Sequence, residues 1–116
     1  MDKTSDVLLK FKHYVYILYS LKDNNFYTGY TTDLKKRLVE HAKGFSTATK
    51  FRKPFKLIHY EYFVNEEDAK AREVFLKSGY GRDQLKKSLQ NTIFFLKKQM
   101  DSPDEITHRD TVPQFE

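Results

Sequence analysis

The chain has 116 residues, no cysteine and a net charge of +5. The lack of cysteine excludes disulfide bridges and thiolate metal sites, and no segment resembles a membrane span or a secretion signal. The first hundred residues hold 20 basic and 11 acidic side chains, a net +9, which favours phosphate-rich partners but does not identify nucleic acid by itself. We therefore expect one compact domain in the cytoplasm, without membrane association.

The beginning of the chain predicts a β-hairpin. Residues 13–19 are β-branched and aromatic on both faces, which is typical of a central strand. Residues 26–30 are expected to pair with them, since the polar segment 22–25 favours a turn. This hairpin would bring Tyr16 and Tyr27, eleven residues apart, towards one edge of a small sheet.

A helix and a long loop are predicted next. Thr32 or Asp33 caps a helix that runs to about Lys43, and Gly44 ends it. Residues 45–54 are polar, basic and closed by a proline, so we expect a loop with room for one short turn of helix.

The second half predicts a strand and two helices. Residues 55–63 form the third strand, and residues 65–77 form a helix capped by Asn65. Residues 78–81 break that helix, and a final helix covers residues 82–100. This order predicts an α+β fold, in which a three-stranded, mainly antiparallel sheet is flanked by helices.

Domain boundaries follow from these elements. Residues 1–12 are expected to be an N-terminal extension, residues 13–100 the domain, and residues 101–116 an acidic, flexible tail. The tail carries a net charge of −4, so it is a candidate competitor with phosphate-rich partners for the basic surface.

The first helix carries two candidate functional side chains. His41 lies on the same predicted face as Leu34 and Leu38, and Arg37 lies one turn before it at the margin of that face. A guanidinium there can hold phosphate oxygens with a fork of donors. The alternative is an arginine that covers the edge of the core and a histidine that caps a helix end.

Glu73 stands where the second helix should be apolar, in one stripe with Ala69 and Leu76. A carboxylate there needs a partner, because burial of an unpaired charge is costly. The alternatives are an ion pair with Arg37 or Arg72 and a bound metal. A single carboxylate suits Mg²⁺ or Mn²⁺, which keep several waters and take oxygens from a phosphate.

Tyrosine at such a site is either a base or a core residue. Its unperturbed pKa is about 10, and nearby cations would favour a phenolate that deprotonates an attacking water. A strand tyrosine with a satisfied hydroxyl is the alternative.

In order and spacing these residues resemble the GIY-YIG nuclease superfamily. The chain is most similar to small stand-alone bacterial members related to the N-terminal nuclease domain of the bacterial excinuclease. The resemblance spans residues 13 to about 89 and is carried by Tyr14-Val15-Tyr16, Tyr27-Thr28-Gly29, Arg37, His41 and Glu73. It implies a three-stranded antiparallel sheet flanked by helices. It also implies divalent-metal-dependent hydrolysis of DNA phosphodiester bonds, in DNA repair or processing.

The resemblance also assigns roles to the residues. Tyr16 or Tyr27 is implied as the general base, and Arg37 as the group that stabilises the phosphorane-like charge. His41 is implied to orient water or the tyrosine network, and Glu73 to bind Mg²⁺ or Mn²⁺.

Three positions depart from the family pattern. Tyr14 replaces the first glycine of the motif that gives the family its name. Tyr30 stands where the excinuclease domain has a lysine, and Leu85 stands where several family members have an asparagine. The alternative function is therefore a DNA-binding scaffold with little or no cleavage activity.

Contacts with DNA are expected from the residues Lys36, Lys50, Arg52 and Lys53. In the loop 45–54, Phe45 and Phe51 stand among basic residues, so the loop can grip the backbone and stack bases. The alternative is a solvated connection anchored by the two phenylalanines.

Other partners follow less directly from the sequence. The apolar run at residues 93–96 predicts either a core contact or an oligomer interface. The chain has no room for a targeting domain, which leaves targeting to a partner protein.

Overall fold

β1 (His13–Ser20) is the central strand of a three-stranded antiparallel sheet. In the computed structural model, which describes residues 11–100, β2 (Phe26–Thr31) and β3 (Phe55–Phe63) pair with it on either side in the order β2–β1–β3. The predicted hairpin, third strand and α+β class are confirmed.

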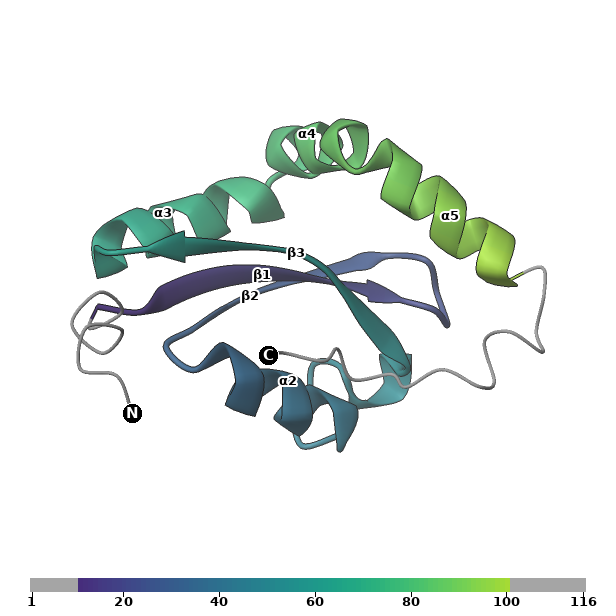
Figure 1. Cartoon of the computed structure of the whole chain (residues 1–116), viewed down its shortest axis with the longest axis horizontal. Helices are drawn as coiled ribbons and strands as arrows, with labels where there is room; N and C mark the ends of the chain where they lie inside the picture. The colour runs from purple at the N-terminus through teal and green to yellow at the C-terminus, as the bar shows by residue number, and fades with distance from the viewer. Residues whose placement is uncertain (1–10, 101–116) are drawn as a thin grey trace, which may run out of the picture.

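Helices cover both faces of the sheet (Figure 1). α2 (Leu34–Ala42) lies on one face, and α3 (Glu66–Lys77), α4 (Gly79–Ser88) and α5 (Gln90–Met100) lie on the other. Both faces of β1 are therefore buried from Val15 on, which explains why residues 14–19 are apolar or aromatic at every position rather than at alternate ones.

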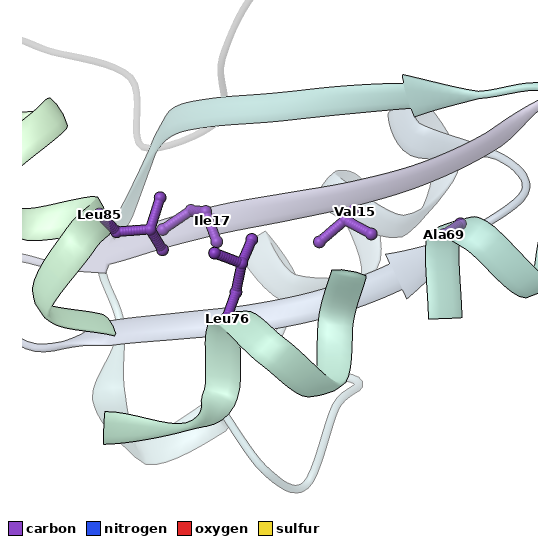
Figure 2. Close-up of a cluster of buried hydrophobic side chains, with 5 residues drawn as sticks. All are labelled: Val15, Ile17, Ala69, Leu76 and Leu85. Carbon is purple, nitrogen blue, oxygen red and sulfur yellow. The ribbon is translucent and has the colours of Figure 1, made fainter. Parts of the chain in front are cut away.

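Alternate residues of β1 build separate clusters on the two faces. Val15 and Ile17 point towards α3 and α4, where they meet Ala69, Leu76 and Leu85 (Figure 2). This contact fixes α3 on the sheet and so determines where the intervening residues of that helix lie.

The opposite face packs against α2. Tyr16 and Leu18 of β1 are buried there with Leu34 and Leu38 of α2 and with Phe55 of β3. The side chain of Tyr16 thus lies between the sheet and the first helix.

Both predicted helix caps are present. The side chain of Asp33 accepts a hydrogen bond from the backbone of Lys36 at the start of α2, and Asn65 does the same for Asp68 at the start of α3. Gly44 follows α2 with a φ of 78°, a left-handed conformation that suits glycine.

The prediction of one continuous final helix is wrong. The hydroxyl of Ser78 accepts from the backbone of Gly81, so a helix begins at once within the expected break. It ends at Leu89, whose φ of −111° and ψ of 21° separate α4 from α5. This change of direction lets Leu89 pack near Leu85 while Leu96 packs against Tyr19.

The loop 45–54 contains one 3₁₀ turn, η1 (Lys50–Arg52), as predicted. Its buried side chains are Ser46 and Thr49. Phe45 and Phe51 are 71% and 73% exposed, so the interpretation of these phenylalanines as anchors of the loop is wrong.

Among residues 11–100, no helix has the length and apolarity needed to cross a membrane. The acidic tail and residues 1–10 of the N-terminal extension lie outside the described residues, so the domain boundaries stay predictions.

Candidate active site

The phenol of Tyr16 lies over Gly29, its cross-strand partner on β2. A Cβ atom at position 29 would collide with the ring and the hydroxyl of Tyr16. Glycine is therefore required here by the close approach of a side chain to the strand, rather than by an unusual φ.

Tyr16 is linked to α2 and to the loop by a chain of two short hydrogen bonds. Its Oη lies 2.7 Å from Nε2 of His41, and Nδ1 of His41 lies 2.7 Å from Oγ1 of Thr49. The exposed fractions of Tyr16, His41 and Thr49 are 1%, 2% and 0%. The three side chains form a polar chain sealed from solvent over most of its length.

The electrostatic surroundings keep the Tyr16 phenol protonated. Burial raises its pKa well above the usual value, and the neighbouring Tyr27 acts in the same direction. The positive charge of Arg37 lowers it, and the negative charge of Glu73 raises it. Arg37 and Glu73 therefore both act on this phenol from opposite sides of the sheet.

His41 is neutral near pH 7. Burial lowers the pKa of its imidazole to about 4, and the positive charge of Arg37 acts in the same direction. The predicted positions of His41 and Arg37, one turn apart at the packing face of α2, are confirmed.

Arg37 lies at the margin of the buried face, with about a third of its side chain exposed. Its Nη1 lies 3.1 Å from Oε1 of Glu40, one turn later on α2. Its positive charge also acts on the nearby phenol of Tyr16, whose pKa it lowers. A guanidinium has five N–H donors, so a partly exposed one can also bind a phosphate group.

Tyr27 lies beside the same imidazole. Its ring centroid is 5.1 Å from that of His41 and 6.3 Å from that of Tyr16. Unlike Tyr16, Tyr27 is only partly buried. The two tyrosines and the histidine therefore form one aromatic group along the β2 edge of the sheet.

Glu73 does not pair with either of the arginines that its position suggested. Its Oε2 lies 2.9 Å from Nζ of Lys77, one turn later on α3, and 20% of its side chain is exposed. Arg72 is held by Glu61, with Nε 2.8 Å from Oε1. The expectation of an ion pair with Arg37 or Arg72 is therefore wrong.

The carboxylate of Glu73 suits a hard divalent cation. Within the described residues no three His, Cys, Asp or Glu side chains form a group able to hold a metal. A single carboxylate fits a divalent cation such as Mg²⁺ or Mn²⁺, which retain water and share phosphate oxygens. An exposed lysine partner is easily displaced from such a carboxylate.

The residues expected to contact DNA divide into two groups. Lys36, Lys50 and Lys53 are exposed. Arg52 is engaged instead, since its Nε lies 2.6 Å from Oδ2 of Asp23 and its Nη2 donates to the carbonyl of Phe26. The structure favours a structural role for Arg52, which ties the loop to the hairpin turn.

Thr49 is a site residue that sequence reasoning missed. It lies in a loop without periodicity, and nothing in the local sequence marks it as buried. Its neighbour Ser46, whose carbonyl accepts from the backbone of Thr49, is also buried. The sequence therefore held no signal for Thr49.

The fold and this side-chain group define the class of protein. Residues 12–87 match the family model described as the GIY-YIG catalytic domain. The chain therefore belongs to the GIY-YIG family, a family of nucleases.

Several relatives match more than half of the chain. UPF0213 protein CPE1444 of Clostridium perfringens is 42% identical over 66 residues, which cover 56% of this chain and 70% of the relative. UPF0213 protein SSP2268 of Staphylococcus saprophyticus is 38% identical over 76 residues, which cover 65% of this chain and 92% of the relative. The solution NMR structure of UPF0213 protein BH0048 from Bacillus halodurans is 42% identical. The match covers 64% of this chain and 81% of the chain in that structure, with a TM-score of 0.42.

Proposed function

We propose that the protein is a divalent-metal-dependent endonuclease that hydrolyses DNA phosphodiester bonds. One observation carries the proposal. The phenol of Tyr16 is hydrogen-bonded to His41 of α2, and the charges of Arg37 on α2 and Glu73 on α3 both act on it. Phenol, guanidinium, imidazole and carboxylate are together the groups that phosphodiester hydrolysis requires.

Tyr16 is the proposed general base, and Tyr27 is the alternative. The positive charge of Arg37 supports Tyr16, because a nearby cation favours the phenolate, the form that can accept a proton from the attacking water. Tyr27 is supported by its greater exposure, which makes its hydroxyl easier for water to reach.

Arg37 is proposed to stabilise the charge that develops on the phosphate. Its guanidinium keeps its proton at every relevant pH, and its ion pair with Glu40 holds it at the edge of the site. His41, neutral and fixed by two hydrogen bonds, is proposed to orient the tyrosine.

Glu73 is the residue that would hold Mg²⁺ or Mn²⁺. When bound, such a cation supplies a Lewis acid for the phosphate oxygens. The helix that carries Glu73 is held in place for this role, since its residues Ala69 and Leu76 are buried against β1.

DNA would be bound by the exposed lysines near α2 and the loop. Lys36, Lys50 and Lys53 fit contacts to phosphates, and the exposed rings of Phe45 and Phe51 fit contacts to bases. We further propose a role in DNA repair or processing in the cytoplasm, with a partner protein supplying targeting.

The test is nicking of supercoiled, single-stranded and branched DNA in Mg²⁺ or Mn²⁺. Glu73→Gln should reduce the rate by about 10²–10³ if the carboxylate acts in the reaction. Lys77→Gln is the matched control, because it breaks the same ion pair but leaves the carboxylate in place. Equal nicking by the wild-type protein and Glu73→Gln would indicate a contaminating nuclease and remove the proposal.

The second candidate is a DNA-binding scaffold that cleaves poorly. It is favoured by Leu85, which is buried in the core cluster and offers no polar group at the asparagine position. It is also favoured by Tyr30, whose hydroxyl is bonded to His13. Salt-dependent DNA binding without cleavage in any tested metal would support this candidate.

A further inference from the structure

Two cavities lie between α2 and β3. One has a volume of about 270 Å³, and its lining includes Leu34 of α2 and Tyr60 of β3. The other has a volume of about 280 Å³, and its lining includes Leu38, one turn later on α2, and Leu57, three residues earlier on β3. The cavities therefore follow one another along both elements and form one furrow, which we call the α2–β3 furrow.

Three tyrosine rings gather at the first of these cavities. The ring centroid of Tyr14 on β1 lies 6.1 Å from that of Tyr60 and 5.7 Å from that of Tyr62, both on β3. Tyr60 and Tyr62 are paired with Tyr16 and Tyr14 across the sheet, so their side chains stand on the face that carries α2. They are 46% and 38% exposed. Two neighbouring rings on a strand thus offer an open aromatic surface beside the helix.

The α2–β3 furrow is basic at both ends. Lys12 and Lys35 line the cavity that holds the tyrosine rings, and Lys53 lines the other cavity. Within residues 11–100, Lys12 and Lys35 form no ion pair. The acidic residue of the lining, Asp33, is engaged as the cap of α2. This charge distribution is complementary to a polyanion.

Aromatic rings between lysines fit an unpaired polynucleotide strand. Bases in a duplex offer only their edges to a protein, so a side chain can stack on a base only where the base is unpaired. The phenol of Tyr14 stays uncharged and does not repel phosphates, because burial and the neighbouring Tyr62 and Tyr60 raise its pKa. The nine residues of α2 span about 13 Å, the length of about four stacked nucleotides.

α2 lies between this furrow and the groups proposed for cleavage. The phenol of Tyr16 lies over Gly29 and beside Tyr27, both on β2, whereas the furrow lies along β3 on the other side of β1. The guanidinium of Arg37 interacts electrostatically with the phenols of Tyr16 and Tyr27. A strand held in the furrow and a strand presented to Tyr16 would therefore pass on opposite sides of α2.

We propose that the α2–β3 furrow binds an unpaired DNA strand, so that the substrate is branched DNA whose single-stranded arm separates from the cleaved strand around α2. Tyr60 and Tyr62 stack on the bases of the arm, and Lys12, Lys35 and Lys53 contact its phosphates. The cleavage of the second strand rests on the proposed function, whereas the binding of unpaired bases in the furrow does not.

The test is binding of fluorescent DNA to the full chain, measured by anisotropy without divalent metal. The probes are a blunt duplex, the same duplex with a single-stranded thymidine arm, and the same duplex with an abasic arm of equal length. The two arms carry the same phosphates, so the difference between them reports contacts with the bases. Wild type should bind the thymidine arm at least about 5-fold more tightly than the abasic arm.

Three variants assign that difference to the furrow. Tyr60→Ala should lose about 5-fold or more in affinity for the thymidine arm and nothing for the abasic arm. Tyr60→Phe keeps the ring and should bind as wild type does. Tyr80→Ala is the matched control and should also bind as wild type does, because Tyr80 is 69% exposed but lies on α4, across the sheet from α2 (Figure 1).

Ring-proton NMR of Tyr60 and Tyr62 tests the wild-type protein directly, so the result does not depend on whether a variant folds. The thymidine-armed duplex should shift these signals, and the abasic-armed duplex should leave them in place. Unshifted signals with the thymidine arm would overturn the proposal, as would equal wild-type affinity for the two arms.

The proposed function and the α2–β3 furrow can fail separately. If the armed duplex is bound as expected but is cleaved in neither Mg²⁺ nor Mn²⁺, the proposed function fails and the furrow still binds unpaired DNA. If the protein cleaves DNA but binds and cuts the blunt duplex as well as the thymidine-armed one, the proposed function stands and the furrow proposal is overturned.

Discussion

The ring of Tyr16 lies against the backbone of Gly29 so closely that no side chain fits between them. The two residues are paired across β1 and β2, in a part of the sheet with ordinary strand geometry. Gly29 therefore sets the position of the phenol, and through it the bond to His41.

Gly29→Ala should displace the phenol of Tyr16 from His41. We expect cleavage to fall by about 10²–10³, the size of losing one group of the site. The added methyl adds no backbone strain, because Gly29 is not among the positions with a positive φ. Gly79→Ala is the matched control, since a methyl group at that position of α4 would meet no other part of the protein within 4 Å. Equal activity of the two variants would contradict this prediction.

Local patterns in the sequence predict most of the fold. The continuous apolar run of β1 indicates a strand buried on both faces, and the caps Asp33 and Asn65 locate two helix starts. The split of the final helix at Leu89 was missed, because neither glycine nor proline marks it. Its cause is packing against two different parts of the core.

The sequence predicts those residues of the candidate site whose positions follow from the spacing along a helix. Arg37 and His41 follow from the i, i+4 spacing, and Glu73 from its apolar neighbours. Thr49 does not follow, because it reaches His41 only through the path of the loop. The long-range ion pair between Arg52 and Asp23 helps to set that path, and no sequence period encodes it.

The pH dependence of stability should carry a contribution from His41. Its folded-state pKa of about 4 lies below the ordinary value of 6.5. Between these values the unfolded chain binds more protons at this residue, so stability falls as the pH is lowered from 6.5 towards 4. The contribution is at most about 1.4 kcal/mol per pH unit.

The measurement is urea unfolding of wild type and His41→Gln across that pH range. Wild type should lose stability more steeply on acidification, and the difference between the slopes isolates this histidine from other groups. Parallel slopes would show that His41 titrates with an ordinary pKa in the folded protein.

Alanine substitutions at Arg52 and Lys50 should distinguish a residue that stabilises the fold from one that binds DNA. Arg52→Ala removes the ion pair with Asp23 and should lower the free energy of unfolding by about 1 kcal/mol, since the pair is partly exposed. Lys50→Ala should leave unfolding unchanged and reduce the salt slope of DNA binding by about 1. Thermal unfolding and binding titrations at several salt concentrations check both. If Arg52→Ala has the same free energy of unfolding as wild type, the structural role of this arginine is wrong, and Arg52 would again be expected to contact DNA.

Phe51 should contribute to binding of unpaired bases. Its ring is 73% exposed, lies 4.8 Å from Nζ of Lys50, and belongs to a loop held down by buried Ser46 and Thr49. Stacking on such a ring contributes about 1–3 kcal/mol per base, so Phe51→Ala should weaken single-stranded DNA binding by about 5- to 140-fold. Phe94→Ala is the control, because Phe94 is 66% exposed but lies on α5, across the sheet from the loop. If both variants bind single strands as wild type does, the exposed rings of the loop do not stack on bases, and the lysines alone must account for affinity.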